Sequence, residues 1–199
     1  MGMPATRHHW TTAEVRALNL ATPSWPRYEL IDGELLVTQA PAWPHQIAVG
    51  ELLLLLVPYV DRHDIGVALS APADVELLPD SITQPDVFVA KALSSEVLGA
   101  GAWSGRTELL LTTEVISPSS VRTDRIDKRM HYLKAGVPEY WVVDLDAREV
   151  ERWTPGRDTP TILSTTLAWH PDGADAPLVI DLVLYFETVW RKWNKLGHP

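Results

Sequence analysis

Cysteine is absent from the 199-residue chain, so disulfide bonds and thiolate metal sites are excluded. This absence fits a reducing compartment, and we expect a cytoplasmic location. Long apolar runs are also missing, because the longest, Leu52 to Val57, has six residues and is followed by a proline. Six residues cannot cross a bilayer, since a spanning helix needs about 20. Residues 1–10 contain no apolar segment, so we expect a flexible leader there and no signal peptide.

Positive charge is scarce, with 17 lysines and arginines against 26 acidic residues and a net charge of −9. Broad non-specific affinity for nucleic acid needs many cations facing phosphates, so this balance argues against it. A nuclease whose acidic cleft is neutralised by a bound metal is still compatible. The chain also lacks a GxxxxGK[ST] phosphate loop, a Ser/His/Asp or Cys/His triad motif, a zinc-binding spacing and a separate DNA-reading module.

Local signals alternate between helices and strands. Thr11 and Glu14 form a capping box that begins a short helix. Asp32-Gly33 predicts a hairpin between strands at 28–31 and 34–37. Further short apolar runs indicate strands at 66–69, 75–78, 86–90, 109–116, 139–143 and 150–153.

Two longer helices complete the pattern. Leucines on almost every side of a helix at 45–60 predict that it is deeply buried. A helix at about 121–135 places one apolar face toward the core, made of Ile126, Met130, Leu133 and Val137. The mixture predicts an α/β protein with one central mixed β-sheet covered by helices on both faces. We expect a leader and short helix over 1–24 and a single domain over 25–199.

Two carboxylates lie on apolar strand patterns, Asp86 at the start of one and Glu114 near the end of another. A carboxylate within a strand is unfavourable unless it is paired, and a divalent cation is a common partner. If the two strands are neighbours, both carboxylates can converge on one ion. Mg²⁺ suits such a site because it binds one or two carboxylates and keeps waters for chemistry.

Each of these residues also has a simpler interpretation. Asp86 can bond local backbone amides at a turn, and Glu114 can pair with Arg122 or Arg125. Asp124 and Lys128, one helical turn apart, can form an exposed ion pair that contributes a few tenths of a kcal/mol. His45 begins a helix, where histidine more often caps or packs than catalyses.

A set of short motifs occurs in a fixed order along the chain: Tyr28-Glu29-Leu30-Ile31-Asp32-Gly33-Glu34, Pro44-His45, Gln84-Pro85-Asp86, Glu114-Val115-Ile116-Ser117-Pro118-Ser119, Asp124-Arg125, Lys128, Tyr132 and Gly136-Val137-Pro138-Glu139-Tyr140-Trp141. Together they resemble the Uma family of restriction-type endonucleases, within the PD-(D/E)xK nuclease superfamily, over roughly residues 25 to 155. The resemblance implies a restriction-endonuclease-like fold and a DNA endonuclease that hydrolyses phosphodiester bonds with Mg²⁺, for which Mn²⁺ can substitute. Cutting both strands would favour a homodimer.

Site residues follow from the same resemblance. It implies a metal held by Asp86, Glu114 and Val115, with Glu34 as a third catalytic carboxylate. It also implies His45 and Lys128 as catalytic residues. The superfamily pattern has lysine two residues after the glutamate, where this chain has Ile116, and Lys128 on the next helix is the candidate replacement.

Two other functions are compatible with the sequence. Ile116 and the acidic net charge favour a catalytically inactive nuclease fold that serves as a binding or regulatory module. A hydrolase of small phosphate esters would use the same metal chemistry on a different substrate.

Overall fold

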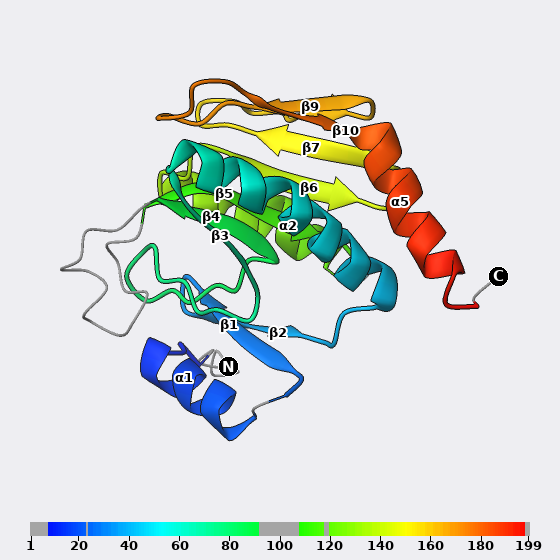
Figure 1. Cartoon of the computed structure of the whole chain (residues 1–199). Helices are drawn as coiled ribbons and strands as arrows, with labels where there is room; N and C mark the ends of the chain where they lie inside the picture. Colours follow the sequence, from blue (N-terminus) through cyan, green and yellow to red (C-terminus); the bar gives the residue numbers. More distant parts are fainter. Residues whose placement is uncertain (1–7, 23, 92–107, 118–119, 198–199) are drawn as a thin grey trace.

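The computed structural model describes residues 8–22, 24–91, 108–117 and 120–197. At its centre is a six-stranded mixed sheet in the order β3-β4-β5-β6-β7-β8 (Figure 1). Its strands are β3 Gly66–Ser70, β4 Val87–Lys91, β5 Leu109–Val115, β6 Tyr140–Asp144, β7 Glu149–Trp153 and β8 Thr161–Leu163. Neighbouring strands are antiparallel except β5 and β6, which are parallel. The predicted α/β class with a mixed sheet is confirmed.

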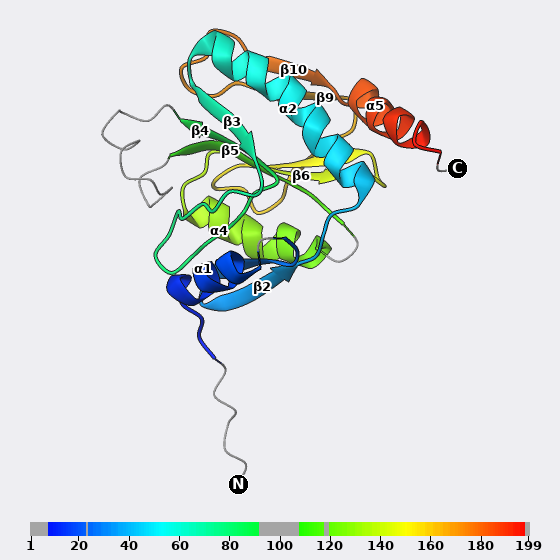
Figure 2. The same cartoon turned by 60° about the horizontal axis from the view of Figure 1, so that its bottom comes forward.

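A helical crossover joins the parallel pair, because two parallel strands cannot be connected by a tight hairpin. It consists of a π-helical segment, η1 (Thr123–Lys128), continued by α4 (Arg129–Lys134). The crossover starts just beyond the end of β5 and lies against one face of the sheet (Figure 2). It therefore holds its side chains next to the end of β5, where Glu114 lies.

Helices cover both faces of the sheet. On one face lie α2 (Trp43–His63) and α5 (Leu182–Asn194), and on the other lies α4 (Figure 2). Strand alternation divides the core between them. Val87 and Val89 of β4 join the cluster that includes α2, whereas Phe88 joins the cluster beneath α4. Beside α5, β9 (Thr166–Trp169) pairs with β10 (Leu178–Asp181) as a separate hairpin.

A second hairpin, β1 (Arg27–Ile31) and β2 (Glu34–Thr38), lies on the α4 side of the sheet (Figure 2). Its turn is the predicted Asp32-Gly33, with both residues at positive φ as a two-residue hairpin loop requires. Helix α1 (Thr12–Ala21) begins with the predicted capping box and packs on β1. The predicted leader over 1–10 falls partly outside the described residues.

Two sequence-based expectations about strands and helices are wrong. The predicted strand at 75–78 is reduced to a single β-bridge between Val75 and Thr83. Helix α2 is longer than predicted and is not buried on all sides, because Leu54 is 66% exposed and Val57 is 38% exposed. Only one side of α2 packs in the core, through Ala48, Val49, Leu52, Leu56, Tyr59 and Val60.

That packing accounts for the composition of α2. By length and composition alone, α2 is apolar enough to cross a membrane. Its buried residues share one core cluster with Val87 and Val89 of the sheet and with Phe186 of α5. The core helix of an α/β protein needs such a composition.

The buried face of the crossover also differs from the expected one. Ile126 is 42% exposed and Met130 is 59% exposed, so this half of the predicted apolar face points outward. Val137 and Leu133, the other half, pack on the core as expected. Asp124, Lys128 and Tyr132 are buried in place of the outward half. The sheet presents a carboxylate to this helix, and a buried carboxylate selects a cation and a hydroxyl as neighbours over isoleucine or methionine. The π-helical turn, a feature frequent at functional sites, lies in the segment that faces it.

A matched pair of leucines on α2 tests this packing. We expect Leu56→Ala to lower the free energy of unfolding by about 2–5 kcal/mol, because it leaves a cavity in the core. Leu54→Ala removes the same atoms from an exposed position and is expected to change that energy by about 0.5 kcal/mol or less. Urea denaturation of both variants measures the difference. Equal losses would contradict the orientation of α2.

Candidate active site

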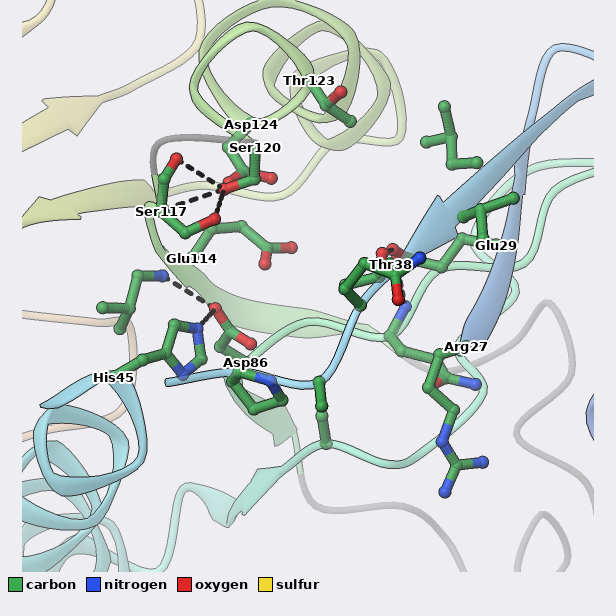
Figure 3. Close-up of a pocket in the computed structure, with 18 of the residues that line it drawn as sticks. Arg27, Glu29, Thr38, His45, Asp86, Glu114, Ser117, Ser120, Thr123 and Asp124 are labelled. Carbon is green, nitrogen blue, oxygen red and sulfur yellow. Dashed lines mark hydrogen bonds and ion pairs between the residues drawn. The ribbon is translucent and has the colours of Figure 1, made fainter. Parts of the chain in front are cut away.

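Asp86 and Glu114 line one cavity of about 380 Å³ at the ends of β4 and β5. The two strands are neighbours, with Val87 opposite Thr113 in the antiparallel register. Asp86 immediately precedes β4, and its Oδ2 accepts a hydrogen bond of 2.8 Å from the main-chain N–H of Val115. The structure thus brings together the two carboxylates that the sequence singled out (Figure 3).

His45 contacts Asp86 from a different element. It lies in the first turn of α2, and its Nε2 is 3.0 Å from Asp86 Oδ2. The Asp86 side chain is 20% exposed, so this carboxylate is fixed on one side and open to the cavity on the other. His45 therefore fixes the orientation of Asp86 through this contact (Figure 3).

Lys128 holds the centre of a buried ion cluster. Its Nζ lies 3.0 Å from Glu114 Oε1, 3.1 Å from Glu29 Oε2 and 3.8 Å from Asp124 Oδ1. The Lys128 side chain is only 6% exposed. The interpretation of Asp124 and Lys128 as an exposed surface pair is therefore wrong, because both are buried and Lys128 also binds two other carboxylates.

Neutral donors complete the cluster. Tyr132 donates its hydroxyl to Glu114 Oε1 at 3.1 Å. Glu29 accepts from the main-chain N–H of Gln84 at 2.7 Å and from the Thr38 hydroxyl at 3.2 Å. Glu114 and Glu29 are thus each held by both a charge and a hydrogen bond, as stable burial of an ion requires.

The pKa values of the cavity carboxylates are shifted in different directions. Burial raises the pKa of Glu114 well above its usual value, and although Lys128 opposes this, the charges of Asp86, Asp124 and Glu29 add to it. Burial likewise raises the pKa of Asp124 to about 6. Burial alone would also raise the pKa of Asp86, but the contacts with His45 and the charge of Lys128 outweigh it and lower that pKa. Negative charge therefore exceeds the positive charge available to it.

Lys128 has the opposite shift. Burial alone would lower its pKa, but Glu114, Glu29 and Asp124 surround the amine and raise the pKa well above the usual value. The amine therefore stays protonated at neutral pH. Lys128 can stabilise negative charge, but it cannot accept a proton as a general base.

Glu34 is not brought to the cluster. It is exposed on β2 and does not line the cavity, whereas Glu29 of β1 is buried against Lys128. Sequence reasoning missed Glu29, although the residue lies within the same motif. The available signal was its position between the apolar residues Tyr28 and Leu30, in a strand that leads to the turn at Asp32-Gly33.

Arg125, one of the two arginines that could have paired with Glu114, pairs with other carboxylates. That guanidinium binds Asp144 at 2.9 Å and Glu151 at 2.5 Å. Glu114 faces Lys128 and Tyr132 instead. The cation that binds Glu114 is thus Lys128 of the following helix, and residue 116 is an isoleucine.

The sequence of the chain matches that of a known protein family. The family model Uma2, described as "Putative restriction endonuclease", matches residues 13–180. The chain belongs to the Uma2 family. The predicted family is thereby confirmed, and the description of that family as restriction endonucleases implies nucleic acid as the substrate class.

A solved structure shows the same fold. It is described as the crystal structure of a "putative nuclease belonging to DUF820" from Anabaena variabilis ATCC 29413. The match has a TM-score of 0.66 and 19% sequence identity, and it covers 85% of this chain and 96% of that chain. No curated protein matches the chain. The nuclease-like fold of this Uma2 chain is therefore shared with a protein of very different sequence.

The donor set of the Uma2 site fits a hard divalent cation. Carboxylate and carbonyl oxygens are the ligands that Mg²⁺ prefers, and one or two protein carboxylates suffice. Within the described part of the chain, no three His, Cys, Asp or Glu side chains are arranged as a metal site. The candidate set therefore consists of Asp86, Glu114 and the main chain of Val115. The carboxylates of Glu29, Asp86, Glu114 and Asp124 all line this cavity, and their excess of negative charge favours a cation there.

Asp124 gives a pH-dependent test of this charge excess. The native carboxyl keeps its proton up to about pH 6, whereas the unfolded chain releases it near pH 3.8. The native state thus binds more protons between these values, and stability falls as the pH rises through them. Asp124→Asn removes this loss. We expect the free energy of unfolding of Asp124→Asn, relative to the unsubstituted protein, to rise by about 2 kcal/mol between pH 4 and pH 7.

Urea denaturation at several pH values, with a chelator present, measures this difference. Asp127→Asn is the matched control, because it removes the same charge from the same helix at a residue that does not line the cavity. A difference for Asp124→Asn that does not change with pH would contradict the assignment.

Proposed function

We propose that this Uma2 chain is a Mg²⁺-dependent DNA endonuclease that hydrolyses phosphodiester bonds, with Mn²⁺ as a possible substitute. One observation carries the proposal. A protonated lysine, Lys128, is buried against Glu114 in the same cavity that Asp86 lines. Two oxygen ligands and a fixed cation around one cavity are the groups that hydrolysis of a phosphodiester needs.

The chain's residues divide the task between them. Asp86 and Glu114 would hold the ion together with the carbonyl of Val115, and the ion would polarise a phosphoryl oxygen and activate a water. His45 keeps Asp86 oriented through the 3.0 Å contact. Asp86 is ionised at neutral pH because its pKa is lowered, so it is ready to bind a cation.

Lys128 would stabilise the negative charge that develops on the phosphate. Its amine is held in place by Glu29, Glu114 and Asp124, so little reorganisation is needed at the moment of reaction. Glu29 is therefore a positioning residue in this proposal. The homodimer and the cytoplasmic location suggested by the sequence remain predictions.

Metal binding and cleavage test the proposal directly. We expect calorimetry to show binding of Mg²⁺ and Mn²⁺ that is lost in Glu114→Gln and Asp86→Asn, because each substitution removes a charged ligand. Both variants should cleave duplex DNA at least 100-fold more slowly than the unsubstituted protein, since catalysis of this kind contributes about that much or more. Assays on single strands and on nucleotides run in parallel would reveal a hydrolase of small phosphate esters. Full cleavage by Glu114→Gln would contradict the proposal.

A second pair of variants separates the two glutamates of the hairpin. We expect Glu29→Gln to reduce cleavage by about 10-fold or more, because it removes a partner that fixes the Lys128 amine. Glu34→Gln should leave cleavage unchanged, because Glu34 is exposed and outside the cavity. Circular dichroism and thermal melting establish that both are folded. The reverse order of effects would restore Glu34 as the third catalytic carboxylate.

A further inference from the structure

Arg27 is a cation of the cavity that the proposed chemistry does not use. It is the first residue of β1, two positions before Glu29, so strand alternation directs both toward the same side. Both residues line the cavity with Asp86 and Glu114. Among the described residues, Arg27 forms no ion pair, and its Nε is buried without a hydrogen-bond partner.

The carboxylates of the cavity already have other partners. Asp86 bonds His45 and the main chain of Val115, and Glu29 and Glu114 bind Lys128. The Arg27 side chain extends away from Asp86 and Glu114, toward the other side of the cavity (Figure 3). Its positive charge is therefore not neutralised by the acidic cluster and is available to a ligand.

An indole ring supports the guanidinium. Arg27 Cζ lies 5.8 Å from the centroid of the Trp25 ring, within the range of a cation–π contact. Trp25 also lines the cavity and is 41% exposed. A guanidinium placed on an aromatic ring has fewer orientations to lose when it binds a ligand.

We infer that Arg27 binds a phosphate of the DNA strand next to the phosphodiester that is cut, with Trp25 holding the guanidinium in place. This inference rests on the proposed function. The planar guanidinium can donate two parallel hydrogen bonds to phosphate oxygens, and the buried unpartnered Nε is a donor in need of an acceptor. In a chain with a net charge of −9, an arginine at the cavity that forms no ion pair among the described residues contributes strongly to the attraction of a phosphate.

Salt dependence of DNA binding tests the inference without relying on cleavage. A fluorescent duplex and a single strand of the same sequence are titrated with the protein between 50 and 200 mM salt, once with chelator and once with Ca²⁺. Loss of one phosphate contact should lower the slope of log affinity against log salt by about 0.9 for a duplex, or about 0.7 for a single strand. We expect this loss for Arg27→Gln, together with about tenfold weaker binding near 150 mM salt.

Three further variants make the result specific. Arg62→Gln removes the same charge from an exposed position near the opposite end of α2 from His45, and it should keep the original slope. Arg27→Lys should restore the slope but not the full affinity, because it keeps the charge and loses the two-pronged hydrogen bonding. Trp25→Leu should weaken binding without changing the slope. Thermal melting establishes that each variant is folded.

The outcomes separate this inference from the proposed function. A slope that is unchanged in Arg27→Gln overturns the inference, and cleavage by the unsubstituted protein that depends on Glu114 would still support the nuclease. A slope that falls only in Arg27→Gln supports the inference even where no cleavage is observed. The inference is also overturned if the unsubstituted protein binds neither the duplex nor the single strand, with chelator or with Ca²⁺.

Discussion

The buried amine of Lys128 is the contact on which the site depends. It joins Glu29 of β1 to Glu114 of β5 and Asp124 of η1, and Glu29 lies 85 residues before Glu114 in the sequence. Removing one partner from a buried ion cluster leaves an uncompensated charge, which costs several kcal/mol. The same contacts therefore attach the β1–β2 hairpin to the sheet and fix the crossover helix above β5.

Hydrophobic burial alone would not select this arrangement. An apolar face was available on the crossover, but Ile126 and Met130 lie outward while Asp124 and Lys128 lie inward. Well-packed apolar residues often stabilise a protein as much as a buried ion pair does, so stability gives no reason for this choice. The proposed function does give one, because a preorganised charge beside a carboxylate of the cavity would stabilise developing charge without rearrangement.

How far the sequence could predict the structure depended on the range of the interactions. The Asp32-Gly33 turn and the capping box at Thr11 are specified by neighbouring residues, and the strands with Asp86 and Glu114 by alternation and resemblance. The inward face of the crossover was not predictable, because helical periodicity assigns apolar residues to the core and cannot foresee a carboxylate on the opposing sheet. Glu29 was missed for the same reason, since its burial depends on Lys128, 99 residues further along the chain.

Charge explains how an acidic protein can act on a polyanion. Asp86 and the three carboxylates around Lys128 all line the cavity, and with all four ionised and Lys128 protonated their charge would be −3, being −4 + 1. The raised pKa values of Glu114 and Asp124 reflect this excess. A phosphodiester would be repelled by this charge, and a divalent cation would reduce it to about −1. Substrate binding and cation binding are then thermodynamically linked, because each ion favours the other. Net charge describes only the whole surface, and here the local balance decides what can enter the cavity.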